Sequence, residues 1–460
     1  MKRWLGSILV AVVVLYGMCA WAQNDTGTSE TSAPAQPGPK PAYTYPDATP
    51  SLDFLNGAVE NSSITLGIGA GFSYLSNGYR FINGVANNTQ NRWLFNVTPS
   101  IKIQQFRPRL TWNVAYSGGY QTYTQPGTVA SGNYNLFAQN ASAGLLWQFT
   151  PHWQLSANNN FTYTANPFDS YLTHVGTPTL NNPNPVTYSS ITRYTLNNAF
   201  LALTNQLTKV DTLTFTGTTS YRHTSTYNLA TSVPFYNLTS YGGRLSYSHR
   251  FSARLSVGAG YDYNSLDFGH GQQRSGIQTP QMTVEYLIRP NISISGWIGP
   301  QYTSTKTILG IPIFGQIVYV TNYDSLWSTA LGANFAWRGL RNSFSAGFVR
   351  GVSDGGGIIA TSETDSVTGS YRRMITSKWD ATLGAQYMHL VSTTTSSRRY
   401  DYIDFNAALN YKLTKSFSAD VRYAYIRYNQ SNTFLIGYGN YDENIVGASV
   451  NYTWKHPLGR

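Results

Sequence analysis

The fold is decided by the stretch Arg254-Leu255-Ser256-Val257-Gly258-Ala259-Gly260-Tyr261-Asp262-Tyr263. Every second residue from Leu255 to Tyr263 is apolar or aromatic, and the residues between them are polar, charged or glycine. Because successive side chains of a β-strand point to opposite faces, this alternation predicts a strand with one apolar and one polar side. Segments 402–413, 417–425 and 446–454 repeat the pattern. The sequence therefore predicts an all-β fold.

The composition favours a sheet that lies in a membrane. The chain has 460 residues, of which 11% are charged and 15% aromatic, including 35 tyrosines. Soluble domains carry about 25% charged residues. After the N-terminus, no apolar run is as long as the roughly 18 residues that a membrane-spanning helix needs. Few charges, many tyrosines and low hydropathy together predict a transmembrane antiparallel β-barrel.

The N-terminus reads as an export signal. Lys2 and Arg3 precede an apolar segment from Leu5 to Leu15, and Ala20-Trp21-Ala22 resembles a cleavage site. We expect residues 1–22 to be a cleaved signal peptide; an uncleaved anchor is the alternative. Residues 23–61 are rich in Pro, Ser and Thr and predict a disordered periplasmic leader, acting as a tether rather than as a contact segment or partial plug. The only cysteine lies within residues 1–22, so no disulfide is expected.

Short turns alternate with longer connections along residues 62–460, the predicted barrel. The expected short turns are 106–108, 151–152, 209–211, 251–253, 289–291, 339–341, 376–378 and 414–416. The expected long connections are 77–90, 124–137, 165–193, 225–238, 268–278, 306–322, 352–360, 392–398 and 431–441. Eight plus nine connections give 18 strands, with 16 as the alternative count. Both ends then lie on the short-turn side, and the first strand (about 63–76) pairs with the last (about 442–454).

Aromatic residues gather beside the short turns, as they do in the girdles of membrane barrels. They are Trp153, Trp337, Trp379, Tyr411 and Trp454. With the alternating strands, they make segment 62–454 similar to the porin-type outer-membrane barrels of Gram-negative bacteria. One feature departs from that pattern, because the chain ends on Lys455-His456-Pro457-Leu458-Gly459-Arg460 rather than on an aromatic residue.

This resemblance implies an integral protein of the cell outer membrane. It implies a porin or substrate-selective passive channel for small hydrophilic solutes. An exporter of an acidic exopolysaccharide and a non-conducting structural or adhesive barrel remain the alternatives. The implied partners are outer-membrane lipid and lipopolysaccharide, the barrel-assembly machinery, and small solutes or a polysaccharide.

Enzymatic motifs are missing from the sequence. It contains no His-Glu-x-x-His, G-x-S-x-G or Walker sequence, and its seven histidines are dispersed. We therefore expect no enzymatic activity, no catalytic residues, no cofactor and no metal. The 31 basic residues are scattered without a basic block, which argues against binding to nucleic acid.

Charged residues in phase with the polar face are expected to line the lumen. A cation on the lipid face costs roughly 2–4 kcal/mol near the bilayer centre. The cations are Arg92, Lys102, Arg222, Arg244, Arg254, Arg372, Lys412 and Arg422, and the anions are Asp262, Glu285, Asp380, Asp404 and Asp420. Eight cations against five anions suggest a mild preference for anions. The favoured alternative is a wall in which arginine and aspartate neutralise each other, so that the lumen has no charge selectivity.

A barrel of about 18 strands is too wide for its own side chains to fill, so the lumen holds water, a loop or a plug. Connection 306–322 is unusually apolar, with Ile311-Pro312-Ile313-Phe314 at its centre. It is a candidate constriction loop. The alternative, which we favour, is that it extends the flanking strands above the membrane.

Overall fold

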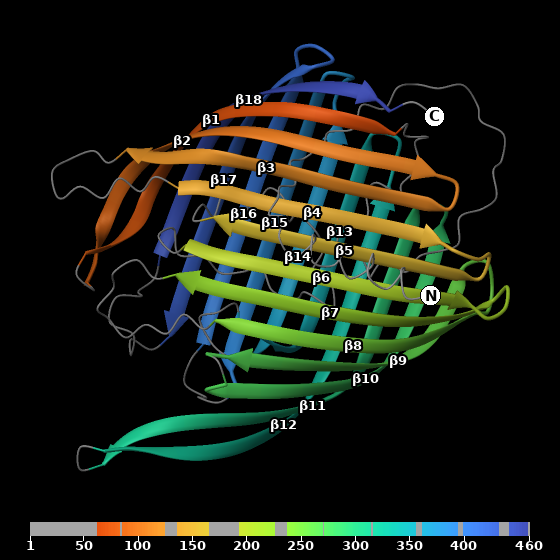
Figure 1. The fold of residues 1–460 in the computed structure, drawn as a ribbon, viewed down its shortest axis with the longest axis vertical. Helices are drawn as coiled ribbons and strands as arrows, with labels where there is room; N and C mark the ends of the chain where they lie inside the picture. Colours follow the sequence, from red (N-terminus) through yellow and green to blue (C-terminus); the bar gives the residue numbers. More distant parts are fainter. Residues whose placement is uncertain are drawn as a thin grey trace, which may run out of the picture.

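The computed structural model describes residues 62–82, 85–124, 136–164, 193–225, 237–269, 271–313, 316–355, 361–393, 399–431 and 441–458. These residues form one closed antiparallel barrel of 18 strands (Figure 1). The barrel closes where β1 (Ser63–Ile82) pairs with β18 (Tyr441–Pro457). The predicted fold class, strand count and closure are confirmed. The expected signal peptide and leader lie outside the described residues.

The other strands follow in chain order, each paired with its neighbours in sequence. They are β2 (Val85–Arg107), β3 (Leu110–Thr124), β4 (Leu136–Gln148), β5 (Trp153–Thr164), β6 (Arg193–Gln206), β7 (Asp211–Ser225), β8 (Leu238–Arg250), β9 (Leu255–Phe268), β10 (Gln273–Arg289), β11 (Ile292–Ile313), β12 (Gln316–Arg338), β13 (Asn342–Ser353), β14 (Ser362–Met374), β15 (Trp379–Ser392), β16 (Arg399–Lys412) and β17 (Phe417–Ser431).

All eight short turns occur where the sequence predicts them. Several share one chemical device, in which a hydroxyl at the start of the turn accepts a backbone N–H three residues later. Thr150, Ser252 and Thr414 do this at 3.0 Å, and Thr376 does so at 3.1 Å. Such side-chain bonds give the backbone a local alternative to the sheet ladder, so the strand ends there.

The outward face of the barrel is apolar and exposed, as a lipid-facing surface must be. Phe215, Leu245, Val284, Ile294 and Ile298 are examples from four strands. Aromatic pairs flank this band on the short-turn side. The rings of Trp147 and Phe149 lie 5.4 Å apart, those of Trp379 and Tyr411 4.5 Å, and those of Phe335 and Phe344 5.9 Å. Within the described ranges, no helix is long and apolar enough to cross a membrane.

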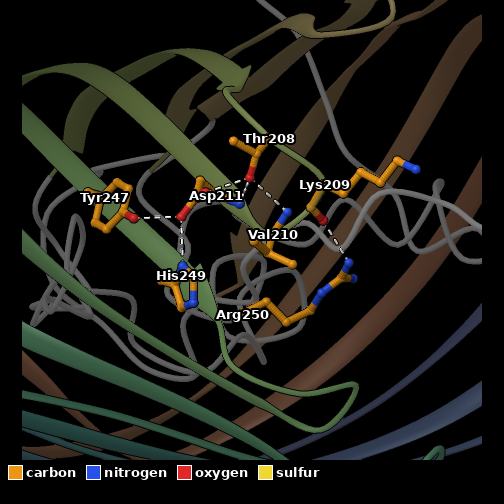
Figure 2. A network of polar contacts seen from close by, with 7 residues as sticks. All are labelled: Thr208, Lys209, Val210, Asp211, Tyr247, His249 and Arg250. Carbon is orange, nitrogen blue, oxygen red and sulfur yellow. Dashed lines mark hydrogen bonds and ion pairs between the residues drawn. The ribbon is translucent and has the colours of Figure 1, made fainter.

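A polar cluster anchors the turn between β6 and β7 on the outward face (Figure 2). Asp211 Oδ1 accepts a hydrogen bond from the Tyr247 hydroxyl at 2.5 Å and lies 2.7 Å from His249 Nδ1. Thr208 Oγ1 donates to the other oxygen of Asp211. The opposite rim repeats the arrangement, because Asp401 accepts from Tyr387 at 2.9 Å and lies 2.7 Å from His389 Nδ1.

Several strands are longer on the long-loop side than the sequence predicts. β1 extends to Ile82 and β2 begins at Val85, so both strands reach into the connection expected at 77–90. β10 begins at Gln273, inside the connection expected at 268–278. β11 and β12 pair over their whole length, up to Ile313 opposite Gln316. β12 pairs with β13 only from Leu331 onward, so the hairpin projects beyond its neighbours (Figure 1).

Candidate functional site

The end of the β13–β14 hairpin turns into the barrel. Val352 packs in one buried cluster with Leu238, Leu266, Phe268 and Ile277, which come from β8, β9 and β10. Those four side chains lie on the inward faces of their strands, in phase with buried Asp262 and Ser275 rather than with the exposed tyrosines. A residue of β13 can reach them only if the hairpin end crosses the space inside the wall. The hairpin therefore narrows the lumen near its long-loop end.

Neutral hydrogen bonds hold the hairpin end on the inner wall. The Val352 backbone N–H donates to Gln301 Oε1 at 2.7 Å, and Gln273 Nε2 donates to Thr361 Oγ1 at 3.0 Å. The hydroxyls of Ser275 and Thr361 lie 2.7 Å apart. All these groups are buried, and each such bond contributes roughly 1 kcal/mol.

A buried ion pair, which we call the Arg222–Asp354 clasp, joins the same hairpin end to β7, the strand next to β8. Arg222 Nη1 of β7 lies 3.1 Å from Asp354 Oδ2, and the side chains are 3% and 11% exposed. Arg222 Nε and Nη2 find no hydrogen-bond partner among the described residues. Removing one partner of a buried pair leaves the other charge uncompensated, so the two residues depend strongly on each other.

Gly355 lets the chain turn directly after the clasp. Its φ of 58° lies in the left-handed region, which glycine adopts without a steric penalty. Its backbone N–H donates to Ser353 Oγ at 3.4 Å, and Ser353 and Thr364 hydroxyls lie 2.6 Å apart across the hairpin. The bend therefore has local support as well as contacts with the wall.

The predicted lumen charges that belong to strands lie in phase with the inward faces, opposite the exposed apolar residues, whereas Arg254 lies in the exposed turn before β9. Their positions follow from strand register and from which neighbouring residues are exposed. The residues with a described side chain are Lys102, Arg222, Arg244, Arg254, Asp262, Glu285, Arg372, Asp380, Asp404, Lys412, Asp420 and Arg422. The side chain of Arg92 lies outside the described part of the chain.

Three of these cations lie beside carboxylates of the same wall. Arg244 Nε is 3.7 Å from Asp262 Oδ1, and Arg372 Nε is 2.8 Å from Asp380 Oδ2. Arg422 pairs with Asp420, which also accepts hydrogen bonds from Ser449 and Asn451. Neighbouring opposite charges make this part of the inner surface a mixed wall rather than a cationic track.

The remaining charges lie apart from these pairs. Arg254 and Glu285 share a small hollow near the short-turn end with Arg250 and Ser256. Asp404 is buried in β16, and Lys412 is half-buried at the end of that strand. The structure does not bring these groups together into one cluster.

The candidate constriction loop lies elsewhere than the lumen-narrowing hairpin. Ile311, Pro312 and Ile313 end β11 within the projecting β11–β12 hairpin, and Phe314 lies outside the described residues. This placement agrees with the alternative in which the apolar connection extends its flanking strands. The narrowing comes instead from the connection expected at 352–360.

Sequence reasoning missed Asp354 as a member of the site. It lies in a Gly-rich connection, Gly351-Val352-Ser353-Asp354-Gly355-Gly356-Gly357, which reads as an exposed loop. The available signal was Val352, an apolar residue beside a run of glycines. Adding Asp354 to the inward charges brings the anions closer in number to the cations.

The closed wall, the exposed apolar band and the polar, charged inner face are the features of a β-barrel that spans a membrane. No family model and no curated relative matches the chain.

Solved structures with a similar chain path do exist, at low identity. The outer membrane protein OpdK of Pseudomonas aeruginosa is 10% identical, with a TM-score of 0.39, over 85% of this chain and 99% of its own. OccK9 (OpdG) of Pseudomonas aeruginosa is 13% identical, with a TM-score of 0.40, over 87% and 100%. OccAB2 of Acinetobacter baumannii is 13% identical, with a TM-score of 0.40, over 86% and 98%. These similarities are weak and concern the path of the chain alone.

Proposed function

We propose that the protein is a passive diffusion channel for small hydrophilic solutes across the outer membrane. The supporting observation is a closed 18-stranded wall with polar inward faces, narrowed from within by the β13–β14 hairpin. Barrels of 16–18 strands leave an aqueous channel when nothing fills them. On this proposal the barrel is a transporter and not an enzyme.

The arrangement of charges favours a diffusion channel over an exporter of an acidic polymer. An exporter needs a dense cationic track along the lumen, whereas Arg244, Arg372 and Arg422 each lie beside a wall carboxylate. We propose that the channel weakly prefers anions over cations. The cations outside these wall pairs, Arg254 and Lys412 among them, are the source of that preference.

The test is the single-channel conductance of the refolded chain from residue 23 in a planar bilayer, with the reversal potential under a KCl gradient. We expect a steady conductance with a small anion preference. Arg254→Glu with Lys412→Glu should move the reversal potential toward cation selectivity, because Lys412 is in phase with the inward face of β16 and Arg254 lines a hollow with the inward residues Ser256 and Glu285. Arg422 is a poorer choice, since Asp420 already neutralises it.

Lys415→Glu is the matched control, because Lys415 lies in the exposed turn between β16 and β17. Its charge reversal should leave the reversal potential nearly unchanged. A folded, heat-modifiable barrel that never conducts would contradict the proposal and favour a gated exporter or a structural barrel. A strong anion preference with block by acidic oligosaccharides would favour the exporter.

A further inference from the structure

The outward faces of β9, β10, β11 and β12 carry an organised strip above the apolar band. Strand register sorts its side chains into three levels, each running across the four strands. The strip continues from lipid-facing Met282 and Ile298 toward the long-loop ends of these strands and onto the β11–β12 hairpin, which projects at the lower left of Figure 1. We call it the β9–β12 strip.

The lower level is aromatic. Tyr263, Gln278, Tyr302 and Trp327 lie side by side on successive strands. Trp327 is 69% exposed, and its ring centroid lies 4.9 Å from that of Tyr302. Exposed tryptophan and tyrosine at this height continue the girdle that meets the interface between lipid tails and headgroups.

The middle level is small and hydroxylated. It runs through Ser265, Gly276, Ser304 and Ser325 in the same strand order. A Cβ added to Gly276 would meet only the Tyr263 ring, at 3.7 Å or more. The level is therefore a shallow floor of hydroxyl groups between larger side chains above and below it.

The upper level places two cations directly opposite each other. Asp267, Arg274, Lys306 and Tyr323 follow one another across the four strands. Arg274 is bonded to Asp267 at 2.8 Å and keeps a 66% exposed side chain. Lys306 Nζ lies 5.9 Å from the centroid of the Tyr323 ring and has no carboxylate partner among the described residues.

Like charges directly opposite on neighbouring strands destabilise a sheet. Arg274 and Lys306 have this arrangement, and Asp267 offsets only one of the two charges. An anion held between them would remove the repulsion. Guanidinium and ammonium groups bind phosphate through charge-assisted hydrogen bonds, and the serine hydroxyls below offer further donors.

We propose that the β9–β12 strip binds the phosphorylated saccharide headgroup of the outer-leaflet glycolipid, with the phosphate between Arg274 and Lys306. The sugar rings lie over the serine floor and against the exposed faces of Trp327 and Tyr323. The order from apolar band to aromatic rings, hydroxyls and cations matches the order from acyl chains to sugar and phosphate in such a lipid. Continuity with the lipid-facing band selects this occupant over a soluble glycan.

The experiment measures the binding of fluorescently labelled lipopolysaccharide to the refolded barrel in detergent, by fluorescence anisotropy. We expect Arg274→Gln with Lys306→Gln to weaken binding about tenfold or more, since the variant loses both cations that make charge-assisted hydrogen bonds to the phosphate. Dephosphorylated lipopolysaccharide should bind the unsubstituted protein as weakly as the phosphorylated form binds this variant. Trp327→Ala should weaken both forms equally.

The control is Arg399→Gln with Arg427→Gln, which removes two exposed outward cations at the same rim but on β16 and β17. It should bind like the unsubstituted protein. Equal losses in the control and in the strip variant would overturn the proposal, since binding would then follow total charge. Unchanged binding in the strip variant, or a change of oligomeric state in Trp327→Ala without loss of binding, would also overturn it. Heat modifiability verifies that each variant is folded.

Discussion

At the scale of single residues, Asp211 shows how a rim carboxylate stabilises a turn. Asp211 is the first residue of β7 and lies at the turn, before Phe215, the first residue of β7 in the exposed apolar band. Hydrogen bonds from Thr208, Tyr247 and His249 favour its charged form and lower its pKa from 3.8 to about 2. A carboxyl whose pKa is lower in the folded protein stabilises it above the unfolded pKa.

We expect this stabilisation to be complete above about pH 5 and to disappear as the pH falls toward 2. Asp211→Asn should lower the thermal unfolding temperature at pH 6, whereas at pH 2 the variant and the unsubstituted protein should unfold at similar temperatures. The measurement is the loss of the heat-modifiable band in detergent against temperature. Asp324→Asn on the projecting hairpin is the control. A difference that persists at pH 2 would show that the carboxylate charge is not the cause.

At the scale of elements, the β13–β14 hairpin depends on the Arg222–Asp354 clasp. Asp354→Ala leaves a buried guanidinium unpaired, at a cost of about 3–5 kcal/mol, which is comparable to the few neutral bonds that remain. We therefore expect the hairpin end to leave the wall part of the time. Single-channel recordings should then show a larger and noisier conductance.

Asp420→Asn breaks an ion pair of the wall without touching the hairpin, so its conductance should stay steady. Arg222→Gln combined with Asp354→Asn replaces the ion pair by neutral groups. This double variant should therefore recover much of the steady, low-noise conductance of the unsubstituted protein. Identical recordings from Asp354→Ala and the unsubstituted protein would show that the hairpin does not narrow the conducting path.

The same elements show what the sequence could predict. Short turns were found because proline, glycine and hydroxyl residues interrupt strict alternation, and the lipid-facing side needs apolar residues at every second position. The sequence does not predict the long-loop ends of β11 and β12, because a strand segment outside the membrane no longer needs that alternation. The sequence does not predict the inward position of Asp354 either, since that position depends on contacts with β7 and β10, which are distant in sequence.

At the scale of the whole molecule, the barrel exists because its first and last strands meet. β1 and β18 pair from Ser63 opposite Pro457 to Ser76 opposite Asn444, so closure joins residues that are far apart in the chain. An open edge would leave backbone groups without partners in the lipid, where each unsatisfied group costs several kcal/mol. This closure is testable by cross-linking, because the chain after residue 22 has no cysteine.

The pair Ser73→Cys and Gly447→Cys should form a disulfide in the folded barrel. The two residues are register partners, and a Cβ built on Gly447 lies 3.4 Å from Ser73 Cβ, close to the roughly 3.8 Å of disulfides. Oxidation should then raise the unfolding temperature, with a stabilisation of up to about 5 kcal/mol because the bond closes nearly the whole chain. Moving one cysteine to Ala448 turns it to the opposite face, so that variant should not cross-link. Cross-linking of the Ala448 variant in place of the Gly447 variant would mean that β1 and β18 meet one residue out of this register.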